Sequence, residues 1–552
     1  MKKVVPLLLL IGILLCALIG KLGYKAYLKY APTKELAEQE AFYGVSGNEL
    51  VLFLDDEQQE ETGLFMSNQV YLPVAWVDAH LNKRFYWDGN EQLLVYTLPD
   101  EVLYMDGDTR GDSGAPVVAV SGQEAYVSAE TITRYTDVRI VPFVKDEVKR
   151  VFVDTGWEAD EWRSLTKDTP VREKGGVKGR IVVQEPEGSR VKVLKTSEGW
   201  SKVRTEDGHV GYVSSRRLGG TESMTYISTF QEPVYASMSM DQKVCLVWHQ
   251  VTSPEGNATI QKLLQNTRGV NVVSPTWFAM TDNEGNYTSL ADKAYVDALH
   301  SLGIQVWALI DNFSSDVQTE VMLSKTSVRK RLIDSLMQEV DTYGLDGLNL
   351  DFESLKESAG PHYIQFIREL SVACRAKQVV LSVDDHVPAP YNVFYDRREQ
   401  GIVADYVIIM GYDEHYSGGE AGPVASYPYV KAGIEGTLEE VPKEKVINAI
   451  PFYTRVWKED TDGNTSSDAL GIADAMSWVR TNLEDLIWQE ENGLYYGYKE
   501  NKKEGKKEIW LEEERSLGMK MDLIREYDLA GVACWKLGFE PADIWDIVKV
   551  NE

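Results

Sequence analysis

The sequence predicts a multidomain protein whose largest part is an α/β barrel of the (β/α)8, or TIM, type. A chain of 552 residues is long enough for several domains. Strand-like and helix-like segments alternate from Met224 onward, a pattern typical of βαβ units and a parallel sheet. Eight of the strand-like segments are apolar, and eight parallel strands close a barrel. Before the barrel, the sequence predicts a transmembrane helix, an α+β stalk and a small β-barrel.

Composition and charge narrow the class of protein. Hydrophobic residues make up 43% and charged residues 26% of the chain, as in a globular protein. The formal net charge of -29 argues against nucleic acid as a partner, because phosphate binding needs a basic surface. Nothing in the residue pattern calls for a metal or an organic cofactor.

The first element is an apolar run from Val4 to Gly20 with lysines on both sides. Its length suits a short membrane span or a long signal-peptide core. No convincing cleavage site follows, and Leu15 before Cys16 does not fit a lipoprotein signal. Residues 1–24 are therefore predicted to anchor the chain in the cell membrane, with the rest outside the cytoplasm. A cleaved signal peptide and secretion are the alternative.

The second element, residues 35–157, is predicted to be a strand-rich α+β module. The segment that begins at Val70 is weakly echoed by the one that begins at Ala125, and each has a strand, a short helix and a pair of strands. This module resembles the small domain at the N-terminus of copper amine oxidases. It lacks a cluster of metal ligands, so we expect a stalk or spacer without copper.

The third element, residues 168–219, alternates strands and turns and resembles a bacterial SH3-like domain. Trp200, Tyr212 and the Asp207–Gly208 turn carry the likeness. Such domains often bind wall peptides, and the alternative is a small barrel that buries these aromatic rings in its core. A locally basic set of residues would suit an anionic wall polymer: Lys192, Lys195, Lys202, Arg204, Arg216 and Arg217.

The last element, residues 224–552, holds the predicted barrel. Its eight candidate strands are Lys243–Trp248, Val270–Ser274, Gln305–Ile310, Gly347–Glu353, Val379–Asp384, Tyr406–Gly411, Val446–Pro451 and Gly531–Trp535. The longest gap, between the last two strands, predicts an α+β insertion at about residues 455–520 that would wall one side of a groove. Cys245 and Cys534 fall on neighbouring strands, where buried free thiols are favoured over a bridge.

The fourth candidate strand carries the polar residues that stand out in the chain. In the segment LDGLNLDFE, Asn349, Asp351 and Glu353 alternate with apolar residues and therefore share one face. Parallel strands are usually buried on both faces, so polar residues that point inward need a role. The inward face of a (β/α)8 barrel opens at the C-terminal ends of the strands, where active sites lie. Glu353 stands at that end.

These residues resemble the DGxDxDxE signature of glycoside hydrolase family 18. Asp346, Gly347, Asp351 and Glu353 match it, and Asn349 departs from it because most relatives have Asp there. Two later segments also fit in the expected order: MGYDEH from Met410 and PFYTRVW from Pro451. The third strand, ALIDNF, lacks the family's S-x-G-G pattern. Asn at position 349 resembles the bacterial branch that includes spore-cortex N-acetylglucosaminidases.

The resemblance implies a role for each matching residue. Glu353 would be the general acid, Asp351 would hold the acetamido N–H of the substrate, and Tyr412 would bind the acetamido oxygen. Proximity to Asp351 should raise the pKa of Glu353. Because an amide at 349 cannot titrate, Asp351 should keep a steadier charge. The remaining matches would contact substrate: Asn349, Asp346, Met410, Asp413, Tyr453, Arg455 and, as the floor of a sugar subsite, Trp535. For Tyr412 and Trp535 the alternative is a core aromatic residue.

The resemblance thus implies a retaining, substrate-assisted hydrolase of β-1,4 bonds next to N-acetylglucosamine. The expected partners are peptidoglycan, or another glycan with N-acetylglucosamine, and a membrane. Hydrolysis of chitin oligosaccharides is the second enzymatic interpretation. A protein that binds wall glycan without cleaving it is the alternative of another class.

Overall fold

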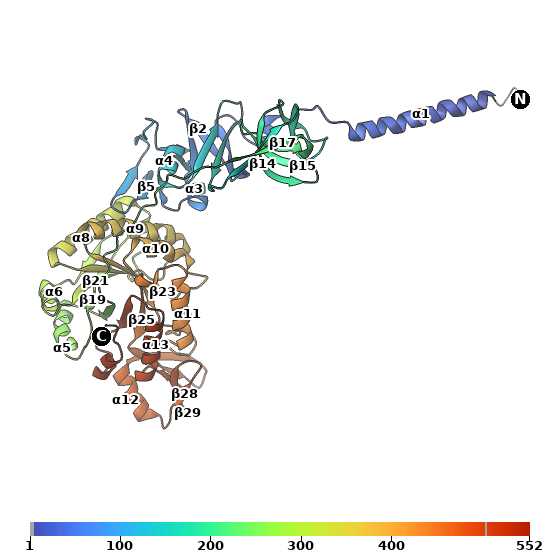
Figure 1. Cartoon of the computed structure of the whole chain (residues 1–552). Coiled ribbons are helices and arrows are strands. Elements are labelled where there is room, and N and C mark those ends of the chain that lie inside the picture. The colour runs from blue at the N-terminus through green and yellow to red at the C-terminus, as the bar shows by residue number, and fades with distance from the viewer. Residues whose placement is uncertain (1–4, 503–504, 552) are drawn as a thin grey trace. The chain divides into compact units, whose positions relative to one another are not determined.

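The computed structural model describes residues 5–502 and 505–551. The chain forms two compact units. One comprises Met1–Trp87 and Met105–Glu232, and the other comprises Asp88–Tyr104 and Pro233–Glu552. Figure 1 labels the helices and strands of both units.

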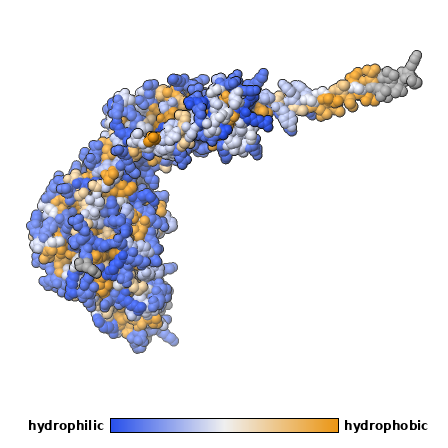
Figure 2. Space-filling model, in the orientation of Figure 1, coloured by the Kyte–Doolittle hydropathy of each residue, from blue (hydrophilic) through white to orange (hydrophobic). Residues whose placement is uncertain are grey.

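The chain begins with one long apolar helix, α1 (Val5–Tyr30). Its stretch Leu9–Tyr30 has a mean hydropathy of 1.8 and is long and apolar enough to cross a membrane. Apolar colour follows this helix in Figure 2. Only its length and composition support a membrane span, and a signal sequence has the same properties.

The first large sheet of this unit has the strand order β7-β8-β3-β2-β1-β10-β9. The segment from Ala125 forms strand, helix and two strands, as expected, and its strand pair β9–β10 joins this sheet. The segment from Val70 follows the same pattern, but its two strands form a separate small sheet with β6. The bounds are β1 (Glu49–Leu54), β2 (Glu57–Met66), β3 (Gln69–Pro73), α3 (Val74–His80), β4 (Phe85–Asp88), β5 (Leu93–Thr97), β6 (Val102–Met105), β7 (Val118–Ser121), β8 (Glu124–Ser128), α4 (Ala129–Tyr135), β9 (Arg139–Phe143) and β10 (Lys149–Asp154).

The SH3-like part of this unit is a second sheet, with the order β13-β12-β16-β15-β14-β11-β17. Its buried core consists of Leu165 and four valines rather than of aromatic rings. Trp200 and Tyr212 are half-buried. The bounds are β11 (Asp160–Leu165), β12 (Thr169–Arg172), β13 (Ile181–Glu185), β14 (Arg190–Ser197), β15 (Trp200–Thr205), β16 (Val210–Ser214) and β17 (Leu218–Met224).

Three of the six predicted basic residues are paired with carboxylates of the same unit. The Lys192 Nζ atom lies 2.7 Å from both Asp56 and Asp160. Arg204 lies 2.8 Å from Asp56, and Lys202 lies 3.0 Å from Glu57. The predicted basic surface for an anionic polymer is therefore wrong at these three positions, because their charges are neutralised inside the unit.

The second unit contains a closed barrel of eight parallel strands, ringed by helices in Figure 1. The strand order is β18-β31-β25-β24-β23-β22-β21-β19, and β18 also pairs with β19, which closes the ring. The predicted fold class is confirmed. The strands are β18 (Val244–His249), β19 (Val272–Met280), β21 (Gln305–Asp311), β22 (Gly347–Asp351), β23 (Val380–His386), β24 (Tyr406–Met410), β25 (Val446–Pro451) and β31 (Gly531–Trp535), and the short β20 (Tyr287–Ser289) pairs antiparallel with β19.

The helices around the barrel bury one apolar side against the strands. Helix α8 (Thr326–Tyr343) buries residues at helical spacing, among them Leu332, Leu336 and Val340. It ends at Gly344, whose φ of 72° is left-handed and therefore suits glycine. The other helices are α5 (Ile260–Leu264), α6 (Lys293–His300), α7 (Thr319–Leu323), α9 (Gly360–Lys377), α10 (Arg397–Val403), α11 (Tyr427–Leu438) and α13 (Glu514–Glu526).

An α+β insertion follows β25, where the sequence predicts one. Its five strands have the order β27-β26-β30-β29-β28, and α12 (Ile472–Asn482) packs on β26 and β27. The strands are β26 (Tyr453–Glu459), β27 (Thr465–Gly471), β28 (Ile487–Gln489), β29 (Leu494–Asn501) and β30 (Gly505–Leu511).

The prediction of buried free thiols in the barrel is confirmed. Cys245 and Cys534 lie on the adjacent strands β18 and β31, and both are buried and unbridged.

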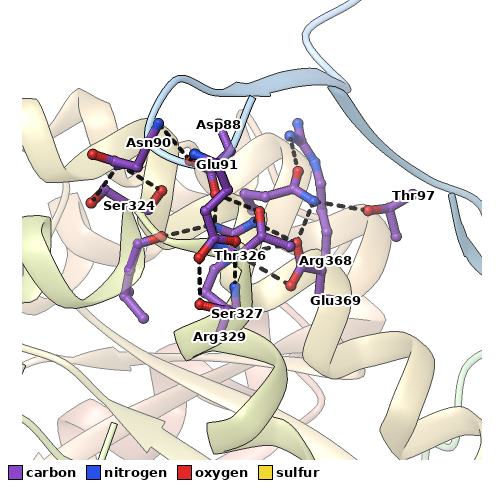
Figure 3. A network of polar contacts seen from close by, with 12 residues as sticks. Asp88, Asn90, Glu91, Thr97, Ser324, Thr326, Ser327, Arg329, Arg368 and Glu369 are labelled. Atoms are coloured by element: carbon purple, nitrogen blue, oxygen red, sulfur yellow. Dashed lines mark hydrogen bonds and ion pairs between the residues drawn. The ribbon is translucent and has the colours of Figure 1, made fainter. Parts of the chain in front are cut away.

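A segment from the N-terminal half of the chain, residues 88–104, packs on the outer helices of the barrel (Figure 3). One Asp88 carboxylate oxygen accepts hydrogen bonds of 2.6 Å from the N–H and the hydroxyl group of Thr326. Glu91 accepts a bond of 2.9 Å from the N–H of Ser327. These N–H groups belong to the first turn of α8, whose own N-cap residue, Lys325, provides no side-chain cap. Helix α8 is therefore capped by a distant segment.

The same segment is held on α9 by buried polar groups. The Gln365 amide donates to the Thr97 hydroxyl oxygen and to the Glu369 carboxylate, at 3.1 and 2.9 Å. Glu369 is ion-paired with Arg329 of α8 at 2.9 Å, and both side chains are fully buried. Arg375 donates to the Pro99 carbonyl oxygen at 2.8 Å. No pattern in the sequence indicated these contacts.

Candidate active site

The polar residues predicted on β22 lie beside a second polar row on β23. The two strands are parallel, and Asn349 is paired with Ser382. Continuing this register places Asp384 opposite Asp351 and His386 opposite Glu353. Alternate residues of a strand share a face, so both rows point into the barrel and run toward the C-terminal ends of their strands.

Asn349 lies at the base of this site and is completely buried. Its Oδ1 atom accepts hydrogen bonds from Trp248 Nε1 at 2.8 Å and from the Ser274 hydroxyl at 3.0 Å. Its Nδ2 atom donates to Ser382 Oγ at 3.0 Å and to Asp384 Oδ1 at 2.8 Å. All four hydrogen-bonding positions of the amide are used. The predicted contact between Asn349 and substrate is therefore wrong.

Asp351 is buried one step closer to the opening. Its Oδ1 atom has no hydrogen-bond partner among the described residues. Burial raises the pKa of this carboxyl well above its usual range, and the neighbouring carboxyls of Asp384, Glu353 and Asp311 raise it further. The prediction that Asp351 keeps a steadier charge because residue 349 cannot titrate does not hold, since Asp384 is a titratable neighbour.

Glu353 follows the end of β22, and its side chain is 32% exposed. Burial, with the carboxyls of Asp413 and Asp311, raises its pKa to about 7. The predicted direction is confirmed, but burial rather than Asp351 is the main cause. The Glu353 backbone is held by Asn312, whose amide accepts from its N–H at 2.9 Å and donates to its carbonyl oxygen at 3.0 Å. His386 Nε2 lies 3.7 Å from Glu353 Oε2.

The end of β24 brings the predicted aromatic and acidic residues together. Tyr412 is buried, and its ring meets that of Tyr453 edge to face, with centroids 6.2 Å apart. The Tyr453 hydroxyl donates to Asp413 Oδ1 at 2.5 Å, and Arg455 lies 3.8 Å from the same oxygen. Tyr453 and Arg455 therefore fix Asp413 at the rim of the site. Met410, the last residue of β24, is buried.

Trp535 ends β31 and is half-buried. Its ring lies 5.9 Å from that of Trp248, which donates to Asn349 at the base of the site. A half-buried indole at the C-terminal end of a barrel strand is available to pack against a sugar ring.

Asp346 is not part of this site. It precedes β22, where it accepts hydrogen bonds of 2.8 Å from the N–H of Val306 and from His300 Nε2. Asp351 is the fifth residue after it, which places the two about 17 Å apart at the rise of an extended chain. The predicted contact between Asp346 and substrate is wrong, because this residue caps the N-terminal end of the barrel.

A cavity of about 510 Å³ lies beside Glu353, between the loops that follow β21 and β22. Asn312, Phe313 and Gln318 line one wall, and Ser354 and Lys356 line the other. The proton-donating group and an open space for part of a ligand therefore share one edge of the barrel.

The sequence comparison decides the family. The profile described as "Glycosyl hydrolases family 18" matches residues 234–540, which is more than half of the chain. The chain belongs to this family. A second profile, described as "Bacterial SH3 domain", matches residues 167–219.

The curated relatives include two proteins of Bacillus subtilis (strain 168). The family 18 chain is 28% identical over 296 residues to a glycosylase of Bacillus subtilis (strain 168), YvbX, and this alignment covers 51% of the chain and 84% of the relative. It is 28% identical over 244 residues to the cortical fragment-lytic enzyme of the same organism, covering 42% of the chain. That alignment spans 55% of the relative's length.

Solved structures share the fold. The spore cortex-lytic enzyme SleL of Bacillus cereus is 17% identical, with a TM-score of 0.51, and the match covers 66% of this chain and 88% of that one. The C-terminal domain of a chitinase from Desulfitobacterium hafniense DCB-2 is 21% identical, with a TM-score of 0.51 and coverage of 56% and 97%. At these identities the likeness shows the (β/α)8 fold alone.

Several residues of this family 18 site were missed by sequence reasoning. Asp384 and His386 were overlooked because the strand was predicted to end at Asp384 and its alternation was not followed. The signal existed, since Ser382, Asp384 and His386 alternate on the strand next to β22. Asn312, in the segment whose role was left open, had no signal, because its bonds to the Glu353 backbone depend on where two loops meet.

Proposed function

We propose that this chain hydrolyses β-1,4 bonds that follow N-acetylglucosamine in peptidoglycan, with retention and with assistance from the substrate. The observation that carries the proposal is the pair at the end of β22. Asp351 offers a buried oxygen that has no hydrogen-bond partner among the described residues, and Glu353 beside it is a partly exposed acid whose pKa is about 7. One group can hold an amide N–H while the other donates a proton.

The proposed reaction uses no second carboxylate as nucleophile. The acetamido oxygen of the substrate attacks the anomeric carbon while Glu353 protonates the departing glycosidic oxygen. Asp351 accepts the acetamido N–H and stabilises the positive charge of the oxazolinium-like intermediate. The Tyr412 hydroxyl donates to the acetamido oxygen and orients it. Glu353, now ionised, then takes a proton from the water that opens the intermediate, which restores both the acid and the configuration.

The relatives of the barrel and the domain that precedes it favour peptidoglycan over chitin as the substrate. Relatives in the same family include one named cortical fragment-lytic enzyme, and a bacterial SH3 domain precedes the barrel. Chitin oligosaccharides share the acetamido group and remain the second substrate. A binding protein without activity is disfavoured, because Glu353 is present and its pKa suits an acid at neutral pH.

The apolar helix α1 supports an anchored enzyme whose barrel lies outside the cytoplasm. If α1 is an anchor, the full-length chain stays in the membrane fraction after a high-salt wash. Release into the medium as a shortened chain would instead identify a cleaved signal peptide.

The decisive test compares the products of wild type and Glu353→Gln on purified peptidoglycan and on chitin oligomers by mass spectrometry. Wild type should release fragments that end in reducing N-acetylglucosamine, and the variant should turn over about 10²–10⁴-fold more slowly with its fold intact. Cleavage of chitin oligomers alone would change the substrate and keep the mechanism. Binding without cleavage of either polymer would refute the proposed activity.

A further inference from the structure

The buried amide of Asn349 and its acceptor Asp384 form an unusual arrangement inside the barrel. Position 349 holds an amide where the family signature has a carboxyl. On the adjacent strand, Asp384 is 2% exposed and accepts a hydrogen bond of 2.8 Å from Asn349 Nδ2. An amide donor fixes Asp384 Oδ1 as an acceptor, so Oδ2 is the oxygen that can bind a proton.

Asp384 also faces Asp351 across the two strands. The register of β22 and β23 places these residues opposite each other, and neighbouring strands lie about 4.8 Å apart. Both side chains are buried, and Asp351 Oδ1 has no hydrogen-bond partner among the described residues. Two buried carboxyls at this spacing cannot both be ionised at low cost, and such pairs share one proton.

We propose that Asp384 is a positioning residue for this reaction: it supplies from β23 the titratable carboxyl that position 349 lacks, and it shares one proton with Asp351. When substrate binds, Asp351 is ionised and accepts the acetamido N–H, and the proton resides on Asp384. This inference rests on the proposed function, since it concerns how Asp351 is charged when it meets the acetamido group.

The groups around the pair set the sign of the pH effect. Asp311 approaches from β21, Glu353 from the end of β22, Asp385 from the same strand as Asp384, and the buried hydroxyl of Tyr412 from β24. His386 lies nearer the opening, against Glu353. The acidic neighbours hold a proton on the pair. While Asp351 is ionised, Asp384 carries the shared proton and stabilises the Asp351 carboxylate, so removing Asp384 should make Asp351 ionise only at higher pH.

The test exchanges the carboxyl between the two strands. Activity of Asp384→Asn is measured as kcat/KM against pH, on a β-linked N-acetylglucosamine disaccharide with a chromogenic leaving group. We expect kcat to fall about tenfold, and the acid limb of the profile, which reports protonation of Asp351, to move up by about one pH unit or more. The double variant Asn349→Asp/Asp384→Asn restores a carboxyl next to Asp351 and should recover most of both changes.

Asp405→Asn is the matched control. Asp405 is also a buried carboxyl of the barrel, but it accepts from the N–H groups of Leu381 and Met238 before β24. This variant should lose stability and leave the acid limb unmoved. An unmoved limb in Asp384→Asn, or an exchange variant that recovers neither change, would show that Asp384 only supports Asn349. If Asp384→Asn does not fold, the exchange variant, which keeps the number of carboxyls, decides by its recovery.

A readout without substrate separates this inference from the proposed function. Infrared difference spectra at neutral pH should show the band of a protonated buried carboxyl in wild type that is lost in Asp384→Asn and regained in the exchange variant, while the band of Glu353 persists in all three proteins. Persistence of the first of these bands in all three would overturn the shared proton. Failure of wild type to cleave either glycan would overturn the proposed activity and would leave the infrared result unaffected.

Discussion

Glu353 shows how one side chain acquires its chemistry from its surroundings. Its carboxyl is partly removed from water, and two further carboxyls face it, so the neutral form is favoured up to a pH of about 7. Its backbone is clamped by Asn312, and this clamp fixes where the carboxyl stands without adding charge. Asn312 thus fixes the position of Glu353, whereas burial and the two carboxyls set its proton affinity.

This arrangement predicts an alkaline limit on activity. An acid must be protonated to donate, so kcat/KM should fall about tenfold per pH unit above the pKa of Glu353, which is about 7. A pH profile on a substrate whose leaving group needs protonation measures this limb. Glu353→Gln cannot titrate and serves as the control. Activity that is constant up to pH 9 in wild type would contradict the assignment.

At the residue scale, prediction from sequence succeeded where chemistry follows one strand. Alternation alone put Asp351 and Glu353 on one face and at the correct end. The family resemblance failed for Asp346, which belongs to the same signature but stands before the strand and lies at the opposite end of the barrel. Alternation also placed Asn349 on the correct face. It did not show how deep in the barrel Asn349 lies, where neighbouring side chains use all the hydrogen-bonding positions of its amide. That depth depends on strands that are distant in sequence.

At the scale of single elements, helix α8 depends on residues far from it in the chain. Asp88→Ala removes the acceptor of the Thr326 N–H and hydroxyl groups and leaves a buried donor without a partner. The loss of a cap and of buried hydrogen bonds should lower the free energy of unfolding by about 2 kcal/mol. Urea unfolding and hydrogen exchange at the first turn of α8 measure it.

Glu101→Ala is the control for this experiment, since Glu101 is an exposed acid of the same segment. We expect its effect to stay within about 0.5 kcal/mol. Equal protection of the first turn in wild type and in Asp88→Ala would show that the segment does not cap the helix.

The strands of the barrel were predictable and the capping segment was not, for one physical reason. An apolar run between two turn signals is visible in a short window, so β25 and β31 have the bounds that the sequence predicts. Asp88 and Glu91 lie in a segment that looks like any hairpin, and their partners lie far along the chain. No local pattern marks a cap that is contributed from elsewhere.

At the scale of the whole molecule, ion pairs hold the SH3-like strands to the module before them. Lys192 bridges Asp56 and Asp160, and all three side chains are largely buried. Lys192→Met would remove the cation that lies between two buried carboxylates and leave Asp56 with Arg204 alone, which should lower the free energy of unfolding of this unit by about 3 kcal/mol. Limited proteolysis and urea unfolding of the full chain measure the loss.

Lys195→Met is the matched control, because Lys195 is an exposed cation on the same strand. It should change stability little. If Lys192→Met resists protease and urea as wild type does, the ion pairs contribute nothing to the junction, and apolar packing alone would hold it.

The cap that Asp88 and Glu91 provide for α8 also restricts how the domains of such an enzyme can recombine during evolution. A recombination event that cuts the gene between the SH3-like part and the barrel would carry away a continuous open reading frame for all eight strands. It would leave Asp88 and Glu91 behind. The transplanted barrel would start with an uncapped helix and a bare surface on α9 where residues 88–104 had packed. In this architecture, the upstream region and the barrel must be inherited together.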